Sequence, residues 1–531
     1  MGSEDPKASA AEAETIETVE MGREPRVLGP HGAGTVRLLD ENTVVLIPTP
    51  SPDPKDPLNL PAWRKFMVIF IVGVYSAFAV ATTSGLGAAT DLLTYPTLFM
   101  GIGNLIAMPL CVAIGRRPVF LLSMVLLVAS GIWCACSKSL SSHIAGRDVF
   151  SMAADQTEAL APMIVQEIHF LHERGSKVAW FVCRQLVLPL FFVATVYIVP
   201  AIGLGWWYAI ITIINGVVLI MAFFFVVETK FERPEDAMEG EVHLHLDENR
   251  DPVAKGGREL LFRVTTAQNH VLQPEKFGPR TWRHDLKVFH GRPDWKACLL
   301  FYKDTALGLA LPTIFWLVVL NGAFLGVYVY QASAFAQILM APSYSFTSAD
   351  LGWVQLAHVL DCVIMVPLLG YGSDRIVKLM SRWRKGIYEP EYRLIVLAIP
   401  AVAVVISCVL YGQAGQFPNK WSWMTIVAPY HLGYFSFLGA NLVGITYAVD
   451  SFPERAGPLL LLICAGRRFI SFGLSYSTVP LISLTGYNGA MNIFAIICGV
   501  LSGLGIAAYF FGGVVRRWAT RTFWKPTDTT Y

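Results

Sequence analysis

Long runs of apolar residues dominate this sequence and restrict what it can fold into. A helix needs about 20 apolar residues to cross the hydrocarbon core of a bilayer. Six runs that meet or approach this length precede residue 230: Phe66–Leu86, Tyr95–Ile114, Val119–Cys136, Ile144–Ile164, Val178–Val199 and Trp206–Val227. Six more follow residue 306: Leu309–Tyr330, Leu351–Tyr371, Leu394–Tyr411, Trp423–Tyr447, Pro458–Leu481 and Met491–Phe511. We therefore expect an all-α integral membrane protein with about 12 transmembrane helices.

The composition agrees with a chain that folds in the lipid bilayer. Hydrophobic residues make up 54% of the 531 positions and charged residues 15%, a balance typical of membrane proteins. No basic stripe is interleaved with aromatic residues, so nucleic acid is not expected as a partner. The nine cysteines show no metal-ligand spacing and are interpreted as small core residues. We expect no cofactor and no metal, and a monomeric protein whose partners are lipid, a small-molecule substrate and protons.

The distribution of Lys and Arg predicts the orientation, because these residues concentrate in cytoplasmic loops. On one side of the membrane we place an N-terminal tail (1–65), a polar central loop (230–306) and a C-terminal tail (513–531). The short turns on that side carry Arg116, Arg117, Arg174, Lys177, Arg375, Lys378, Arg382, Arg384, Lys385 and Arg455. The opposite turns carry only Lys138 and Lys420. Residues 66–229 and 307–512 then form two six-helix bundles with both termini in the cytoplasm, and we assign the protein to the plasma membrane.

The two halves share a short motif. The sequence AIGRRPV (Ala113–Val119) follows the second run, and GYGSDR (Gly370–Arg375) follows the eighth. A single basic turn is common as a topology signal, but its recurrence at the same place in a six-run unit favours an internal repeat. The candidate gating residues in these turns are Gly115, Arg116, Arg117, Asp374 and Arg375.

Longer motifs resemble those of fungal transporters of the major facilitator superfamily, in the twelve-span drug:proton antiporter branch. They extend over most of the chain: LIPTPSPDPKDPLN (Leu46–Asn59), GRRPV (Gly115–Val119), AGR (Ala145–Arg147), HERG (His172–Gly175), ETKFERP (Glu228–Pro234), EPEYRL (Glu389–Leu394) and YAVDSFPERAGP (Tyr447–Pro458). The resemblance implies the major facilitator fold and secondary transport. It also implies a role in proton coupling for Arg147 and marks Asp450 as a further gating candidate. These motifs do not identify the substrate.

The sequence departs from the family pattern at three places. Val112 and Ala113 occupy positions where the family usually has Asp and Arg, so the Asp-Arg pair is present only in the second half. The fifth run contains Pro189 but lacks the Gly-Pro signature of typical antiporters. The first outer connection, about Ala88–Thr94, is shorter than the family pattern implies and is compatible with a lost segment. The sequence therefore supports a transport function more strongly than it supports export as the direction of transport.

The fourth run carries the most charge. Arg147, Ser151, Asp155 and Glu158 are spaced by four, four and three residues, which places them on one face of a continuous helix. Charged groups within a membrane span usually face the bundle interior or a watery cavity. We interpret Arg147, Asp155 and Glu158 as proton-coupling candidates. The alternative is that the arginine pairs with a carboxylate only to lock the helix.

Two other runs carry ionisable residues. His358 and Asp361 in the eighth run share a face with Gln355, and a histidine can change its charge near physiological pH. His358 and Asp361 are therefore further coupling candidates, although a buried histidine also serves as ordinary hydrogen-bonded packing. In the eleventh run Arg467 and Arg468 point about 100° apart on a helix. We expect one of them, Arg467, to face the cavity.

Polar and aromatic residues in the second half are candidates for substrate contact. They are Asn321, Tyr328 and Gln331 in the seventh run, His431 in the tenth and Arg467 in the eleventh. Aromatic residues near a span end also serve as interfacial anchors. For Asp450 the alternative to gating is a helix-end ion pair with Arg455.

The sequence also bears on rival functions. No phosphate-binding G-x-x-x-x-G-K-[ST] motif is present, which disfavours ATP-driven transport. A membrane-embedded enzyme is disfavoured by the lack of a G-x-S-x-G motif and of a metal-ligand cluster. A membrane sensor that binds without transporting is not separated from a carrier by sequence. We expect proton-coupled export of a small organic molecule by alternating access, with proton-coupled uptake of a cation or nutrient as the alternative.

Overall fold

The structure is a computed structural model in which residues 50–84, 91–170, 187–231, 274–384 and 387–522 are described, together with short pieces at 36–37, 39–40, 43–44, 242–244 and 260–262 and the single residues 48, 173, 177 and 524. The helices belong to one compact unit, Gly32–Tyr531. Residues Met1–His31 form the other unit and lie outside the described part. The connection at 85–90 also lies outside it, so the expected short outer turn is not tested.

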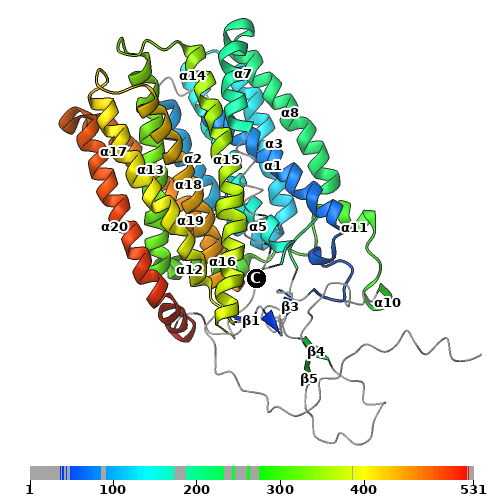
Figure 1. Ribbon diagram of the computed structural model, residues 1–531. Helices are drawn as coiled ribbons and strands as arrows, with labels where there is room; N and C mark the ends of the chain where they lie inside the picture. The colour runs from blue at the N-terminus through cyan, green and yellow to red at the C-terminus, as the bar shows by residue number, and fades with distance from the viewer. Residues whose placement is uncertain are drawn as a thin grey trace, which may run out of the picture. The chain divides into compact units, whose positions relative to one another are not determined.

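Most described residues of the expected first-half runs are helical, and helices run side by side through the molecule (Figure 1). The elements are α1 (Ala62–Ser84), α2 (Asp91–Ile114), α3 (Arg116–Cys136), α4 (Leu140–Ala154), the 3-10 turn η2 (Asp155–Thr157), α5 (Leu160–Glu167), α7 (Val187–Ile202) and α8 (Leu204–Phe225). The fourth run was expected to form one helix. That expectation is wrong, because the helix is interrupted between Ala154 and Leu160.

The second half begins with α13 (Pro312–Met340) and continues with α14 (Ser348–Val354), η6 (Gln355–Ala357), α15 (His358–Met365), the π-helix η7 (Val366–Tyr371), α16 (Gly372–Trp383), η8 (Pro390–Leu397), α17 (Ala398–Gln416), α18 (Met424–Ser451), η9 (Pro453–Arg455), α19 (Ala456–Tyr476) and α20 (Thr478–Thr522). The element α20 is two helices joined at a kink, where Gly486 has φ 68°. The motif GYGSDR was expected to be a turn. Its last four residues instead belong to α16, so the eighth span continues to Trp383.

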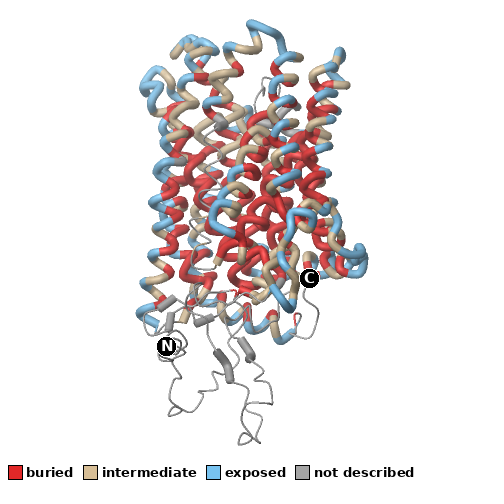
Figure 2. Tube along the Cα trace, turned by 90° about the vertical axis from the view of Figure 1, so that its right-hand side faces the viewer, coloured by how far each residue is buried: buried red, intermediate tan, exposed pale blue. Residues whose placement is uncertain are grey.

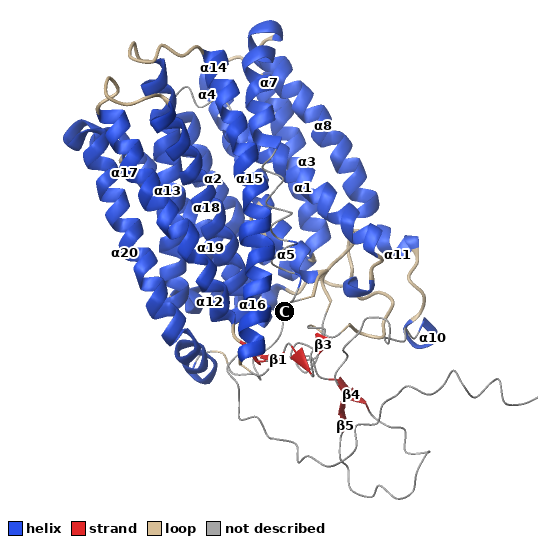
Figure 3. Cartoon of the chain, in the orientation of Figure 1, coloured by secondary structure: helices blue, strands red, loops and turns tan. Residues whose placement is uncertain are grey.

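The central segment is not entirely a loop. Its described part contains α10 (Pro274–Phe277), α11 (Trp282–Leu286) and α12 (Trp295–Leu309). α12 forms because Asp294 caps its first turn and because Ala297 and Phe301 are buried against neighbouring helices. The expected loop 230–306 therefore ends in a packed helix. The other described elements are the 3-10 helix η1 (Pro57–Asn59) and three short strand pairs. The pairs are β1 (Val36–Arg37) with β6 (Ile387–Tyr388), β2 (Leu39–Asp40) with β3 (Thr43–Val44), and β4 (Val242–Leu244) with β5 (Leu260–Phe262), and they lie at one end of the helices (Figure 3).

The burial pattern is that of a membrane protein. Within the described residues, ten helical segments are long and apolar enough to cross a bilayer, and a shorter apolar segment spans Pro189–Ile202. Buried residues line the inner faces of the helices (Figure 2), while large apolar side chains such as Leu122, Ile213 and Phe510 are exposed outward. Exposed apolar side chains of this number require lipid around them.

Close contacts between helices fix the positions of the charged residues. At Gly103 of α2, an added Cβ atom would lie 2.3 Å from the backbone carbonyl oxygen of Met152, so only glycine permits this approach of α2 to α4. The two halves contact each other where α2 packs against α19 and where α7 packs against α14. Residues at the end of α4 are thereby brought next to α19.

Candidate functional site

Pro162 explains why the fourth run breaks. Proline has no N–H to donate and clashes with the carbonyl four residues earlier, which here belongs to Glu158. The chain responds with a 3-10 turn at Asp155–Thr157 before α5 begins. The freed Glu158 carbonyl oxygen accepts a hydrogen bond from the thiol of Cys464 in α19, with 3.1 Å between the sulfur and the oxygen. Unwound backbone inside a membrane is tolerated where protein groups satisfy it in this way.

The Glu158 carboxylate is the centre of a buried ion cluster that joins the two halves. Arg467 and Arg468, both in α19, each donate to its oxygens. The relative exposures of these three residues are 6%, 1% and 9%. We expected only Arg467 to point into the interior, but both arginines reach the same carboxylate because their side chains are long enough to converge from adjacent faces. Arg467 also donates to Asn441 of α18.

Asp155 lies beside this cluster without joining it. Its residue exposure is 0%, and neither carboxylate oxygen has a hydrogen-bond partner among the described residues. A buried ionised group without partners is costly, and a neutral one is far less so. Arg147, which we expected on the same face, donates instead to the hydroxyl of Tyr208 in α8 at 3.4 Å. Arg147 is three helical turns from Glu158, roughly 16 Å along a helix, and is therefore too far away to join the Glu158 cluster.

A second polar cluster lies entirely in the second half. His358 and Asp361 are on one face of α15, as expected, with 3.0 Å between Nδ1 and Oδ2. The structure adds His431 from α18, whose Nδ1 lies 2.7 Å from Nδ1 of His358 and 3.4 Å from Oδ2 of Asp361. Sequence reasoning treated His431 as a substrate candidate on its own, because no local spacing connects it to α15.

Aromatic rings from α13 and α18 lie between the two clusters. Tyr328 stacks on Phe437, with ring centroids 6.1 Å apart and an interplanar angle of 4°. It also contacts Tyr430 and Tyr434, at 5.7 and 4.9 Å. The guanidinium of Arg467 lies over the ring of Phe437, 5.8 Å from its centroid. These rings form an apolar wall next to the buried charges.

The two other substrate candidates make contacts within the second half. Gln331 donates to the hydroxyl of Ser407 at 2.9 Å, and Ser407 in turn donates to the carbonyl of Pro429 at 2.6 Å. Asn321 donates to the carbonyl of Leu317 at 2.9 Å and lies against Gly444, where a Cβ atom would be 2.6 Å from its Nδ2. Both side chains thus contribute to helix packing.

The GRRPV motif forms an anion-binding helix start. Gly115 has φ +122°, and a Cβ atom there would be 2.5 Å from Oε2 of Glu228, so the position suits glycine alone. The Glu228 carboxylate accepts from the backbone N–H groups of Arg116 and Arg117 at 2.9 and 3.2 Å. Carboxylates bind favourably at helix N-termini for this reason.

The side chains of the two motif arginines diverge. Arg116 pairs with Glu167 of α5 at 3.0 Å. Arg117 donates to the backbone carbonyls of Phe223, Asp285 and Lys287, which ties α3 to α8 and to the central segment. Sequence reasoning did not single out Glu167 or Glu228. Glu228 could have been found, because it opens the ETKFERP motif.

The second half has an ion cluster that corresponds to the GRRPV cluster of the first half. Its central residue is Arg393, at the start of the ninth span. Its guanidinium pairs with Asp450 at 2.5 Å and with Asp374 at 3.5 Å. Tyr388 donates to Asp450 at 2.7 Å; burial, together with that carboxylate, raises the pKa of Tyr388 well above its usual range. Arg375 is exposed on α16. Arg393 lies in the EPEYRL motif, which was the available signal for it.

The proposed alternative partner of Asp450 is not the one observed. Arg455 pairs with Asp304 of α12 at 2.5 Å, while Asp450 is bound by Arg393 and Tyr388. Arg455 follows the end of α18 and therefore points toward α12, whereas Asp450 is one turn earlier and faces η8. The partners that the structure gives are thus Arg393 and Tyr388 for Asp450, and Asp304 for Arg455.

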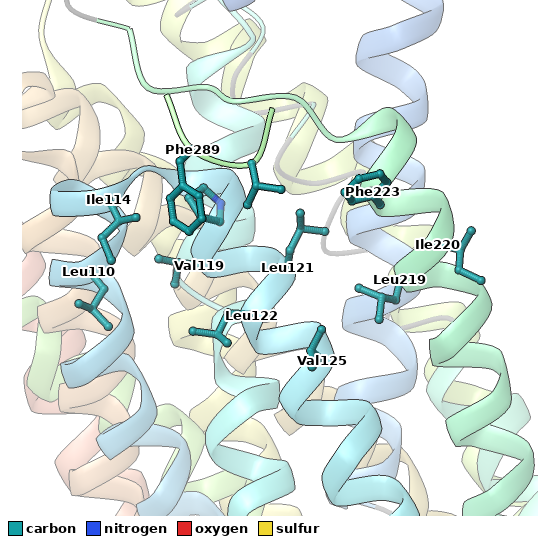
Figure 4. Close-up of a pocket in the computed structure, with 12 residues that line it drawn as sticks. Leu110, Ile114, Val119, Leu121, Leu122, Val125, Leu219, Ile220, Phe223 and Phe289 are labelled. Carbon is teal, nitrogen blue, oxygen red and sulfur yellow. The ribbon is translucent and has the colours of Figure 1, made fainter. Parts of the chain in front are cut away.

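A cavity of about 610 Å³ lies beside the GRRPV motif (Figure 4), where the Arg117 guanidinium lies 5.6 Å from the ring centroid of its lining residue Phe223. It is a groove between α2, α3 and α8, partly covered by Val288 and Phe289 of the central segment. Every lining residue is apolar, and Leu122, Val125 and Ile220 are exposed outward. Its position and lining are those of a lipid-facing surface.

Comparisons with known proteins place this chain among membrane transporters. Residues 63–460 match the model of the Major Facilitator Superfamily. The chain is 22% identical to Protein HOL1 of Saccharomyces cerevisiae, over 91% of this chain and 92% of that protein. It is 21% identical to Efflux pump radE of Floropilus chiversii, over 82% of this chain and 77% of that one. Its fold matches the crystal structure of the human organic anion transporter MFSD10 (TETRAN) with a TM-score of 0.52 at 14% identity, over 84% of this chain and 100% of that chain.

Proposed function

The chain belongs to the Major Facilitator Superfamily, and from that premise we propose that it exports a small organic molecule in exchange for protons. In this architecture the substrate site lies between the two halves, and one half rocks against the other to give alternating access. The name of one relative, an efflux pump, supports export. We further propose that the protein acts as a monomer in the plasma membrane with both termini in the cytoplasm.

The observation that carries this proposal is the Glu158 cluster. Its carboxylate belongs to the first half and its two arginines to the second. Rocking of the halves must change the distance between them, and separating a buried ion pair is costly. A proton on the carboxylate weakens the pair and lowers that cost. Proton binding would therefore be coupled to the conformational change.

Asp155 and the aromatic wall supply the remaining parts of the proposed cycle. Asp155 is buried beside the cluster and has no hydrogen-bond partner among the described residues, so it can take part in proton transfer without first breaking an ion pair. Tyr328, Tyr434 and Phe437 present apolar ring surface next to Arg467. This combination suits an organic molecule with an apolar face.

Uptake of a cation is the second candidate. It is favoured by Asp155, because a cationic cargo could balance a buried carboxylate that has no hydrogen-bond partner in the described part of the chain. In this alternative Asp155 binds the cargo, whereas in export it binds the proton.

The test is flux through purified protein in vesicles of known orientation. Candidate compounds are added with the pH gradient imposed in either direction, and both compound movement and proton movement are recorded. If the protein exports by exchange, the compound and protons should move in opposite directions at a fixed ratio. Both the compound flux and the proton flux should be lost in Glu158→Gln. Movement in the same direction supports uptake. Binding without flux in either orientation would identify a sensor and refute both.

A further inference from the structure

We infer that His358, Asp361 and His431 form a binding site for a divalent transition-metal ion in the second half of the protein. Two of the residues are three positions apart on α15 and the third comes from α18. Their ligand atoms all lie within 4.8 Å of one another, and all three residues are buried. The sequence alone does not reveal this set, because His431 is 73 positions from His358.

The structure brings three possible ligand atoms close together. The two Nδ1 atoms are 2.7 Å apart. At this distance they can share one proton but cannot both carry one, because two N–H groups would repel. Oδ2 of Asp361 lies 3.0 Å from one nitrogen and 3.4 Å from the other. One shared proton therefore cannot satisfy the hydrogen-bonding capacity of all three atoms, whereas a metal ion can bind all of them.

The spacing of these atoms is close to that of a metal site. Zinc binds imidazole nitrogen and carboxylate oxygen at about 2.0–2.2 Å, and tetrahedral ligands at that radius are about 3.3 Å apart. The observed separations are 2.7, 3.0 and 3.4 Å. A small rotation of the His431 ring would widen the shortest of them enough to admit the ion.

The chemistry of the donors selects the class of ion. Two neutral imidazoles and one carboxylate suit Zn²⁺, Co²⁺, Ni²⁺ or Cu²⁺, whereas Mg²⁺ and Ca²⁺ prefer oxygen ligands alone. The Nε2 atoms of both rings have no hydrogen-bond partner among the described residues. The acceptor beside Nδ1 of His358 is Oδ2 of Asp361, so a proton lies on Nδ1 when no ion is bound. The ion must displace this proton; each ring hydrogen then lies on Nε2, and the two Nδ1 lone pairs bind the ion.

The surroundings favour retention of an ion. Tyr430 and Tyr434 lie against the His358 ring, with centroids 5.2 and 4.2 Å away. They exclude water, which strengthens the attraction between the ion and its ligands. Bound metal would cross-link α15 to α18 without touching the first half. The site is therefore independent of the Glu158 cluster, and its test does not depend on the proposed transport function.

The experiment uses the full-length protein in detergent, stripped with a chelator and titrated with Co²⁺. We expect visible absorption from a four- or five-coordinate cobalt ion, saturation at about one ion per chain, displacement by Zn²⁺ and no displacement by Mg²⁺. His431→Gln should weaken binding by more than the roughly 10–100-fold loss typical of changes outside the ligand shell. His143→Gln removes another buried histidine, in α4, and should leave binding unchanged.

A second variant separates direct ligation from a folding defect. His431→Cys puts a metal-binding sulfur near the place of the lost nitrogen, and the longer metal–sulfur bond offsets the shorter side chain. Cobalt binding should therefore persist and gain an intense near-ultraviolet band from the cobalt–thiolate bond. Wild-type affinity in His431→Gln would overturn the proposal. So would equal losses in His143→Gln and His431→Gln, or cobalt binding to His431→Cys without the new band.

Discussion

The thiol of Cys464 donates a hydrogen bond to the backbone carbonyl of Glu158, with the sulfur 3.1 Å from the oxygen. The two residues come from opposite halves of the protein. Pro162 makes the contact possible because it leaves that carbonyl without its helical partner. A local sequence feature in the fourth span thereby creates a connection between halves at the same residue whose carboxylate binds Arg467 and Arg468.

Removing the Glu158 charge should destabilise the protein and abolish transport. Glu158→Gln leaves two buried guanidinium groups without their anion, and breaking such a pair costs about 3–5 kcal/mol. The melting temperature of the purified variant should fall clearly. Glu158→Gln combined with Arg468→Gln should recover part of that loss, because one uncompensated charge is removed as well. If Glu158→Gln had the same melting temperature as the wild type, the ion cluster would be contradicted.

Asp155→Asn should separate coupling from binding. The side chain keeps its size and makes no hydrogen bond in the described structure, so the melting temperature should change little. Substrate binding should persist, while the response of flux to the pH gradient should disappear, because an amide cannot exchange a proton. Ser151→Ala, one turn earlier in α4, is the matched control and should retain the pH response. An unchanged response in Asp155→Asn would show that coupling occurs elsewhere.

Gly115→Ala should be strongly destabilising. The position has φ +122°, and the new Cβ atom would lie 2.5 Å from the Glu228 carboxylate that caps α3. Strain of this kind costs about 1–3 kcal/mol, and displacement of the carboxylate adds to it. Gly216→Ala provides the control, because a Cβ atom at Gly216 of α8 would meet nothing within 4 Å. Thermal melting of the two variants should differ clearly; equal melting curves would rule out the tight contact at Gly115.

His169, which follows α5 and lies outside the fourth span, should make stability depend on pH. Burial lowers its pKa to about 4, and its ring nitrogen Nδ1 lies 2.7 Å from the carbonyl oxygen of Val165. The pKa in the unfolded chain is about 6.5, so between these values the unfolded state binds more protons. Stability is then complete above about pH 6.5 and falls by about 3 kcal/mol as the pH drops to about 4. His169→Gln should flatten this part of the melting-versus-pH curve while leaving the slope near pH 8 unchanged. A variant curve as steep as the wild-type curve would refute the assignment.

The orientation can be tested with cysteine labelling of intact cells. Asp247 and Lys255 lie outside the described residues and are expected on the cytoplasmic side. Asp247→Cys, made in a Cys136→Ser background, should not react with a membrane-impermeant thiol reagent. Native Cys136 is exposed at the end of α3 and is expected on the outer side, so it should react and serves as the positive control. Efficient labelling at position 247 would reverse the proposed topology.

The sequence by itself determined the helical membrane class and the approximate positions of the spans, because the cost of exposing backbone polar groups to lipid imposes long apolar runs that can be read locally. It also singled out most of the buried charged residues, since charge within a span is rare. Motifs such as GRRPV and EPEYRL located the two helix-end clusters but not the pairings within them.

Only the tertiary structure decided which charged residues meet. Glu158 and Arg467 are 309 positions apart, and His358 and His431 are 73 apart, so no periodicity connects them. The expected alignment of Arg147 with Asp155 and Glu158 assumed an unbroken helix, whereas Pro162 and the contact with α19 favoured a 3-10 turn. The spans follow from local interactions with lipid, but the partner of each buried charge follows from how the helices pack, and that depends on the whole chain.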